Sequence, residues 1–283
     1  MGHVNILLTF RLKYERTMNT EFKFDFSNTE TSATLQKVQK RMPKNRYPGP
    51  APVRKKDGDK SMIRNVIFDV DGTLWDSARQ VTAAWQEVLD RHPETKAVKI
   101  TVDDMYRYMG HTMYEISCMM LPDISEELRA LIMQDCMENE DQYLRAHSGD
   151  FYPGCMETIE RLHEEGYRVY IVSNCQDGYI ETLIEDAGWI LGPVEVEGDV
   201  QDFECYGRTG KKKGSNIRLL MERNGLPKES CVYVGDTAMD EAGAAQAGIR
   251  FIYASYGFGT VANPKAVIHE ISELPEVLQR LSK

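Results

Sequence analysis

The sequence lacks any apolar run long enough to cross a membrane, for which about 18 to 20 residues are needed. The longest apolar run near the N-terminus spans only residues 4–10 and is followed by Arg11 and Lys13. It has neither a basic leader nor a cleavage site of small residues, so we expect no secretory signal. With 42% hydrophobic and 28% charged residues, the composition is that of a globular protein. These features predict a cytoplasmic protein that acts without a membrane.

Closely spaced cysteine pairs are also missing. The six cysteines stand at positions 118, 136, 155, 175, 205 and 231, and no two lie within four residues of each other. This spacing excludes a local Cys-x-x-Cys metal or redox motif. In a chain of 283 residues without a signal peptide, we expect reduced and mostly buried thiols rather than disulfides.

Positive charge is scarce except at the N-terminal end. The net charge is −10, but residues 1–61 carry 13 Lys and Arg against 6 Asp and Glu, and the remaining residues carry 21 against 38. An acidic body argues against nucleic acid as a partner. If the substrate is an anion, a local feature of the site must offset the negative electrostatic potential of this acidic body.

Residues 1–61 show no pattern that would form a core. Prolines at 43, 48, 50 and 52 favour extended and unpacked chain. We therefore expect a basic, disordered extension, and we hypothesise that the working protein begins at or near Met62. The segment could be translated leader sequence, or it could be a genuine basic tail held loosely by the acidic body.

From Met62 onward, short apolar strands alternate with helices. Strands are predicted at 66–68, 169–172, 231–234 and 249–253, and helices at 155–165, 214–224 and 238–247. This alternation is typical of an α/β fold with a Rossmann-like parallel sheet. A helical pattern over 76–147 interrupts it. We therefore predict a core of residues 62–75 and 148–283 with an inserted α-helical cap at 76–147.

Three of the predicted strands end in polar residues. Asp69 and Asp71 follow the first strand, Ser173 and Asn174 the second, and Asp236 the third, with Asp240 one helical turn later. Ligands of open parallel sheets bind beyond the carboxyl ends of the strands, so these side chains should converge. Carboxylates that close repel one another. A hard cation with oxygen ligands, Mg²⁺ in the cytoplasm, would relieve the repulsion and reverse the local field.

The strings around these residues resemble the motifs of a known superfamily. Asp69-Val70-Asp71-Gly72-Thr73-Leu74, Ser173-Asn174, a downstream lysine and Gly235-Asp236-Thr237 with Asp240 are similar to the four motifs of the haloacid dehalogenase superfamily. The resemblance covers residues 62–283. The helical block, Tyr152-Pro153-Gly154 and Tyr256-Gly257-Phe258-Gly259 resemble its phosphoglycolate-phosphatase-like branch. An Mg²⁺-dependent phosphoric monoester hydrolase is implied.

The resemblance also implies catalytic and metal-binding roles. Asp69 would be the nucleophile that forms an aspartyl-phosphate. Asp71 would protonate the leaving oxygen and then deprotonate the attacking water, and its backbone carbonyl would bind Mg²⁺. Asp69 and Asp236 would bind the metal directly, and Asp240 directly or through water. An acid at position 71 separates phosphatases from the dehalogenases, since carbon–halogen cleavage needs no proton on the leaving group.

Further residues are implied on the phosphate side. Ser173 would donate to a phosphoryl oxygen, helped by backbone amides near Asn174. Gly72 would let the backbone approach closely, and Thr73 belongs to the same substrate-binding set.

The motif lysine is one of three adjacent candidates, Lys211, Lys212 and Lys213. The family lysine often precedes an apolar helical position by four residues, which selects Lys213 through Ile217. In members with another local string the offset is six, which selects Lys211. We predict Lys213 as the catalytic lysine and keep Lys211 as a substrate-binding candidate.

A glycine break in the predicted cap is the candidate for contact with the substrate. Residues 108–113 separate two helical runs, so Gly110 and His111 could close over the phosphate site and exclude water. The alternative is a plain turn between two helices.

Three functions follow in order of preference. The first is a phosphatase for a small phosphorylated metabolite, phosphoglycolate-like by resemblance. The second is a phosphomutase of the β-phosphoglucomutase type, and the third a non-catalytic binding protein with a basic N-terminal arm. The expected partner is the small phosphorylated substrate, with neither nucleic acid nor membrane, and the protein would be a monomer or homodimer. The physiological substrate stays open.

Overall fold

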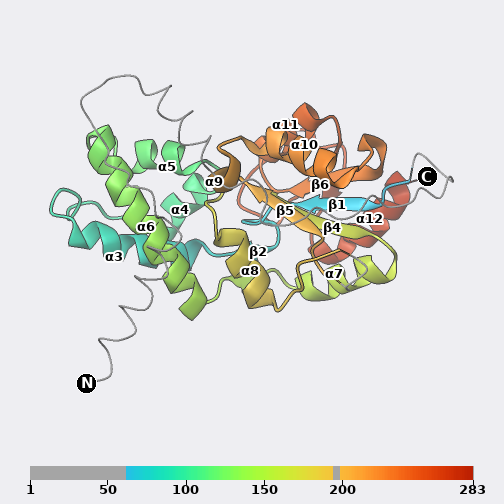
Figure 1. Cartoon of the computed structure of the whole chain (residues 1–283), viewed down its shortest axis with the longest axis horizontal. Coiled ribbons are helices and arrows are strands. Elements are labelled where there is room, and N and C mark those ends of the chain that lie inside the picture. Colours follow the sequence, from blue (N-terminus) through green and yellow to red (C-terminus); the bar gives the residue numbers. More distant parts are fainter. Residues whose placement is uncertain (1–61, 194–197, 283) are drawn as a thin grey trace, which may run out of the picture. The chain divides into compact units, whose positions relative to one another are not determined.

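The computed structural model describes residues 62–193 and 198–282, all within one unit spanning 47–283 (Figure 1). The predictions made for residues 1–61 lie outside the described residues. The centre of the unit is a six-stranded parallel sheet with the order β5-β4-β1-β6-β7-β8. Its strands are β1 (Asn65–Phe68), β4 (Arg168–Ser173), β5 (Asp202–Cys205), β6 (Cys231–Gly235), β7 (Arg250–Ala254) and β8 (Val267–Ile268). The predicted α/β class is confirmed.

Strand β1 lies in the middle of the sheet and is buried along its whole length. Asn65 is aligned with Arg168 of β4 on one side and with Cys231 of β6 on the other. A strand covered on both faces is mostly apolar, and the run from Val66 to Phe68 is why this strand could be predicted from the sequence. Strands β5 and β8 were not predicted, because β5 contains two acidic residues and β8 has only two residues.

Helices cover both faces of this sheet. The helices of the core are α7 (Cys155–Glu164), α8 (Tyr179–Ala187), α9 (Tyr206–Thr209), α10 (Lys213–Asn224), α11 (Ala238–Ala247) and α12 (Leu274–Leu281), with short 3₁₀ turns at Lys228–Ser230 and Ile271–Glu273. In Figure 1, α10 and α11 lie on one side of the sheet and α7 and α12 on the other. Successive side chains of a strand point to opposite faces. Accordingly, Ile67 packs with Ile217 and Ala244 on one face, while Val66 and Phe68 belong to the core of the other.

A block of four helices interrupts the core after β1. It consists of α3 (Ala78–Arg91), α4 (Val102–Tyr108), α5 (Met113–Met120) and α6 (Glu126–Ala146). The chain enters it through β2 (Trp75–Asp76) and leaves it through β3 (Asp150–Phe151), and these two strands pair antiparallel. The predicted helical insertion is therefore present. The pattern over 101–147 breaks at 109–112 and 121–125, where Thr112 and Ser125 cap new helices.

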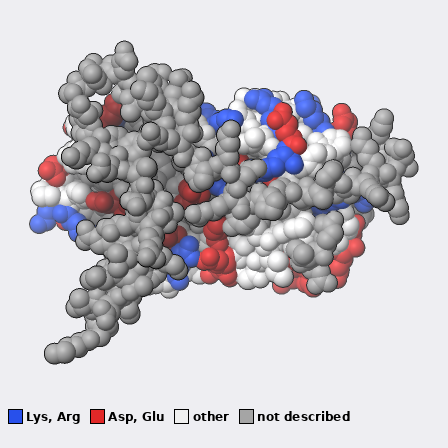
Figure 2. All heavy atoms as spheres, viewed as in Figure 1, with Lys and Arg blue, Asp and Glu red and all other residues white. Residues whose placement is uncertain are grey.

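The surface and the cysteines agree with the composition. No helix in the described part of the chain is long and apolar enough to span a membrane. All six cysteines are free thiols, and five of them are buried. In Figure 2, acidic and basic side chains are interspersed over the visible described surface, with Lys and Arg gathered over α10 and α11.

Candidate active site

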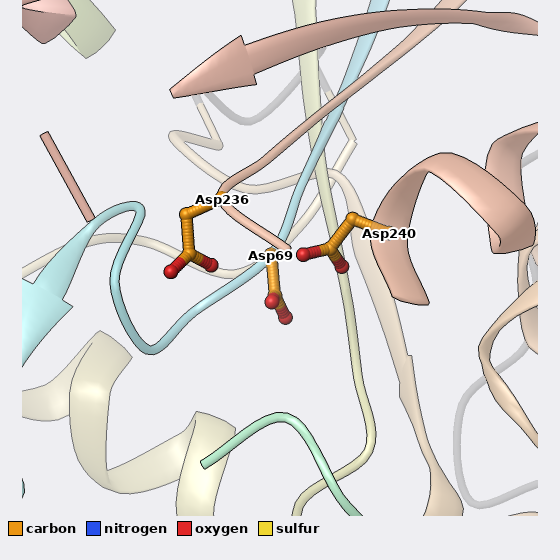
Figure 3. A group of neighbouring side chains, drawn as sticks. All are labelled: Asp69, Asp236 and Asp240. Atoms are coloured by element: carbon orange, nitrogen blue, oxygen red, sulfur yellow. The ribbon is translucent and has the colours of Figure 1, made fainter. Parts of the chain in front are cut away.

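Three aspartates meet at the carboxyl edge of the sheet (Figure 3). Asp69 directly follows β1, Asp236 follows β6, and Asp240 lies in the first turn of α11. One carboxylate oxygen from each of the three lies within 4.8 Å of the others, and all three residues are buried. The structure therefore brings the first and fourth motifs together, as predicted from the sequence, although Asp71 lies outside this group of carboxylates.

Lys213 is the lysine that the fold brings to these carboxylates. It is the first residue of α10 and is only 3% exposed. Its Nζ lies 2.8 Å from Asp69 Oδ2 and 2.5 Å from Asp240 Oδ1. Burial alone would lower the pKa of Lys213, but the two carboxylates raise it well above its ordinary value, so the side chain stays charged.

Lys211 and Lys212 point elsewhere. Both are exposed, and Lys212 pairs at 2.8 Å with Glu115 of α5. The structure therefore favours the four-residue offset to Ile217 over the six-residue offset that selects Lys211.

The aspartate group has the donor set of a site for a hard divalent cation. One lysine faces three carboxylates, and Asp69 Oδ1 and Asp236 Oδ1 are buried with no hydrogen-bond partner among the described residues. Buried oxygens without partners are rare unless they bind an ion or water. Desolvation, followed by repulsion from Asp240, raises the pKa of Asp69 well above its ordinary value and that of Asp236 to about 7. Mg²⁺ would fit these residues.

Asp240 differs from the other two because both of its oxygens are already engaged. Oδ2 accepts from the backbone N–H of Thr237 at 2.8 Å and from its hydroxyl at 2.6 Å, completing the capping box of α11. Oδ1 accepts from Lys213. A contact from Asp240 to a metal through water agrees best with this arrangement.

Glycines let two loops pack against Asp236. Gly72 has a φ of +78°, and a Cβ there would lie 2.3 Å from Asp236 Oδ2. A Cβ on Gly257 would lie 2.3 Å from the Gly72 carbonyl oxygen. The second loop also donates the backbone N–H groups of Phe258 and Gly259 to Asp236 Oδ2, at 2.7 and 3.2 Å. The backbone at Gly72 therefore lies close to Asp236, a candidate metal ligand.

Asp71 occupies a separate place beside the group. Its Oδ1 accepts from the Tyr179 hydroxyl at 2.6 Å and from the Ser77 hydroxyl at 3.2 Å. Desolvation raises the pKa of Asp71 to about 6, against the lowering effect of these two hydrogen bonds. A carboxyl poised near neutrality can give and take a proton. Ser77 and Tyr179 were not predicted, because nothing in the local sequence links them to Asp71.

The second motif joins the core to the helical insertion. Asn174 Nδ2 donates to the Gly110 carbonyl at 2.8 Å, and its Oδ1 accepts from the backbone N–H of Lys213 at 3.1 Å. Ser173 is buried at the end of β4, where its Oγ accepts from the Cys175 N–H at 3.3 Å. Thr73 Oγ1 is buried without a partner among the described residues.

A cavity of about 30 Å³ lies between the helical insertion and the core. Asp71, Ser173 and Asn174 line it from the core, and Gly110 and His111 line it from the insertion. Lys211 is not among its lining residues. The predicted catalytic acid, part of the predicted phosphate-binding set and the predicted cap contact therefore line one cavity.

The comparisons with known proteins agree with this geometry. The family model of the haloacid dehalogenase-like hydrolases matches residues 63–248, about two thirds of the chain. The chain belongs to this hydrolase family. A curated relative, the phosphoglycolate phosphatase of Vibrio parahaemolyticus serotype O3:K6, is 27% identical over 232 residues, which cover 76% of this chain and 96% of the relative. The predicted superfamily and its phosphoglycolate-phosphatase-like branch are confirmed.

Two further proteins are similar to this chain. A 5′-nucleotidase of Pseudomonas aeruginosa is 25% identical over 199 residues, covering 69% of this chain and 84% of the relative. The solved structure of a haloacid dehalogenase-like hydrolase from Streptococcus pneumoniae matches with a TM-score of 0.63 at 19% identity, over 76% of this chain and 97% of that one. The second likeness concerns the fold alone. Membership of a hydrolase family sets aside the alternative of a non-catalytic binding protein.

Proposed function

We propose that this enzyme is an Mg²⁺-dependent phosphatase that hydrolyses a small phosphorylated metabolite, phosphoglycolate-like in size, through an aspartyl-phosphate. Its class is that of the phosphoric monoester hydrolases, in agreement with its family and phosphatase relatives. The observation that carries the proposal is the buried group of Asp69, Asp236, Asp240 and Lys213, with the separately held carboxyl of Asp71 beside it.

The residues divide the chemistry between them. Asp69 is oriented by Lys213 through Oδ2, and one of its carboxylate oxygens attacks phosphorus. The bond to the leaving oxygen breaks as Asp71 gives that oxygen its proton. Water then attacks phosphorus and gives a proton to Asp71, while the bond between phosphorus and Asp69 breaks, which releases inorganic phosphate and restores the Asp69 carboxylate. Mg²⁺, held by Asp69, Asp236 and the Asp71 backbone carbonyl, would neutralise charge on the phosphoryl group.

Phosphate-binding and cap roles complete the proposal. Ser173, the amides near Asn174, Gly72 and Thr73 bind phosphoryl oxygens. Residues 76–147 act as the cap on a core of residues 62–75 and 148–283, and the Gly110-His111 segment shields the reaction from water. The hydrogen bond from Asn174 to Gly110 supports this role, because it joins the segment to the phosphate side.

Hydrolysis is favoured over the phosphomutase alternative by the lining of the cavity. A mutase must hold a second phosphate, which calls for cationic side chains. Among the described residues that line the cavity, none is Lys or Arg. Water is therefore the better acceptor for the phosphoryl group.

We further propose that the enzyme works in the cytoplasm, as a monomer or homodimer, without nucleic acid. Six unpaired thiols support a reducing compartment.

The test is release of inorganic phosphate from a panel of small phosphorylated metabolites, with Mg²⁺ and with EDTA. We expect turnover of at least one ester that requires the metal and is lost in Asp69→Asn. Equal turnover in EDTA, or normal turnover by Asp69→Asn, would contradict the mechanism.

A further inference from the structure

The cavity has a polar cluster in its lining besides the phosphate-binding candidates. Its walls are largely apolar and come from the insertion, with Val81, Met105, Met109, Met113 and Ile116 among the lining residues. Glu140 of α6 and Gln176, which follows β4, also line it. Because Asp71 protonates the leaving oxygen, the leaving group must extend from Asp71 into this space. The residues that line this cavity therefore determine which leaving groups can bind.

Glu140 holds the amide of Gln176 in one orientation. Glu140 is 2% exposed, and its Oε1 accepts from Gln176 Nε2 at 2.7 Å while its Oε2 accepts from Trp85 Nε1 at 2.6 Å. With the amide nitrogen turned to Glu140, Gln176 Oε1 is left as the free atom. That oxygen is buried with no hydrogen-bond partner among the described residues, and Gln176 as a whole is only 8% exposed.

The cavity offers an anion no fixed positive charge. No Lys or Arg lines it among the described residues, and its one basic residue, His111, has Nδ1 3.9 Å from Glu115 Oε2. Two carboxyl groups, Asp71 and Glu140, line it instead. Burial raises the pKa of Glu140 to about 8. A carboxylate that entered would lose its water without gaining an ionic partner, which is costly.

We propose that this cavity selects phosphate esters of small neutral alcohols that carry a further hydroxyl group, and that it rejects esters whose leaving group is a carboxylate. The substrate hydroxyl donates to Gln176 Oε1 and so satisfies the buried acceptor. Glu140 is a positioning residue that keeps this acceptor turned to the ligand. The inference rests on the proposed phosphatase function and narrows it, since phosphoglycolate itself becomes a poor substrate.

Three esters of nearly equal size separate the possibilities. 2-Hydroxyethyl phosphate carries the hydroxyl, propyl phosphate replaces it by a methyl group, and phosphoglycolate carries a carboxylate. We expect kcat/KM of the full-length wild type for 2-hydroxyethyl phosphate to exceed that for each of the other two by at least about tenfold, because an unpaired buried polar group discriminates strongly.

Variants of Gln176 test the assigned atom. Gln176→Met should raise KM for 2-hydroxyethyl phosphate about tenfold and remove its advantage over propyl phosphate. Gln176→Lys should raise kcat/KM for phosphoglycolate relative to the other two esters. Gln134→Met is the matched control, because Gln134 lies exposed on α6 and contacts only Glu138 there. Inhibition by inorganic phosphate should be unchanged in Gln176→Met, which shows that the phosphate side is intact.

The outcomes are distinguishable. Wild-type hydrolysis of phosphoglycolate as fast as, or faster than, 2-hydroxyethyl phosphate would overturn the inference and leave the phosphatase function standing. Equal rates with propyl phosphate would likewise remove the role of Gln176. If no phosphate ester were hydrolysed in Mg²⁺, the proposed function itself would fall, and the inference with it. The wild-type comparison decides even if a Gln176 variant does not fold.

Discussion

Two neighbouring carboxyl groups differ in their surroundings, and this difference assigns their roles. Asp69 is paired with Lys213 inside the aspartate group, whereas Asp71 accepts hydrogen bonds from the hydroxyls of Tyr179 and Ser77. The charge of Lys213 favours the ionised form of Asp69, against the burial and the neighbouring Asp240 that raise its pKa, and a divalent cation bound at the aspartate group would favour ionisation further. A carboxyl with a pKa of about 6 can carry a proton at working pH.

Substitution of either aspartate should remove turnover without unfolding the protein. We expect Asp69→Asn to be inactive, because an amide is not a nucleophile. Asp71→Asn should lose about 10²- to 10⁴-fold in kcat through loss of the proton carrier. Steady-state kinetics with thermal melts would check this, with the exposed Asp123→Asn as the control. Near wild-type hydrolysis by either variant would contradict the assignment.

Lys213 should matter for both stability and activity. Lys213→Ala leaves Asp69 and Asp240 buried without their cation, and breaking such a buried pair costs about 3–5 kcal/mol. We expect a lower melting temperature, a higher KM and a lower kcat.

Its two neighbours are matched controls. Lys212→Ala loses only an exposed ion pair with Glu115, worth about 0–1 kcal/mol, and Lys211→Ala exposes no buried group. If Lys211→Ala lost activity and Lys213→Ala kept it, Lys211 would be the catalytic lysine instead of Lys213.

Glu140 makes stability depend on pH. Burial is the main cause that raises its pKa from 4.5 to about 8, against the hydrogen bonds from Gln176 and Trp85. Between these two values the unfolded chain loses a proton that the folded protein keeps. The free energy of unfolding therefore falls as pH rises through this window, by about 1.4 kcal/mol per pH unit from this group alone.

Glu140→Gln should cancel that part of the dependence, because an amide does not titrate. Urea denaturation of both proteins at pH 5, 6, 7 and 8 would measure it. The free energy of unfolding of the variant should increase relative to that of the wild type at each higher pH. Parallel stability curves would show that Glu140 is ionised in the folded protein.

At the scale of elements, the segment between α4 and α5 connects the insertion to the catalytic edge of the sheet. The Gly110 carbonyl accepts from Asn174, which also binds the backbone of Lys213 at the start of α10. Gly110 has a φ of +85°, and a Cβ there would lie 3.0 Å from Met239 Cε of α11. A side chain there would hold a strained backbone conformation and would have to displace the Met239 methyl group by a few tenths of an ångström.

Gly110→Ala should lower kcat/KM about tenfold and reduce stability by about 1–2 kcal/mol, the cost of a left-handed backbone for an ordinary residue. Gly188→Ala is the matched control, because Gly188 ends α8 with a φ of +67° and a Cβ there would meet nothing within 4 Å. Both variants should melt earlier, and only Gly110→Ala should change the kinetics. If the two variants had equal kcat/KM, the segment between α4 and α5 would be a turn without a role in catalysis.

At the scale of the whole molecule, the match to relatives is confined to part of the chain. The Vibrio phosphoglycolate phosphatase is covered over 96% of its length by 76% of this chain, and the family match begins at residue 63. The core and insertion within 62–283 therefore span nearly all of that relative.

We expect the 62–283 fragment, expressed alone, to match the full chain in melting temperature and specific activity. All the candidate site residues lie within it, and so do the two hydrophobic clusters of the described part. Thermal melts and phosphate release with Mg²⁺ are the measurements. An insoluble or inactive fragment would make residues 1–61 a structural part of the enzyme.

The sequence by itself determined four strands of the sheet, β4, β1, β6 and β7, and the edge at which the candidate site residues meet. Strand β1 is buried on both faces, so its last three residues, Val66 to Phe68, form an apolar run. The polar residues after β1, β4 and β6 must meet because parallel strands end at one edge. The family resemblance favoured Lys213 through its four-residue offset to Ile217 and left Lys211 as the alternative, and the structure places Lys213 beside Asp69 and Asp240.

Only the tertiary structure decided what surrounds each carboxyl. Tyr179 reaches Asp71 across 108 positions of the sequence, and Gln176 meets Glu140 across 36. Phe258 and Gly259 donate to Asp236 from another loop. These partners arrive through the packing of whole helices and loops, and no local spacing encodes such a contact. Yet they decide which carboxyl holds a proton and which leaving group the cavity accepts.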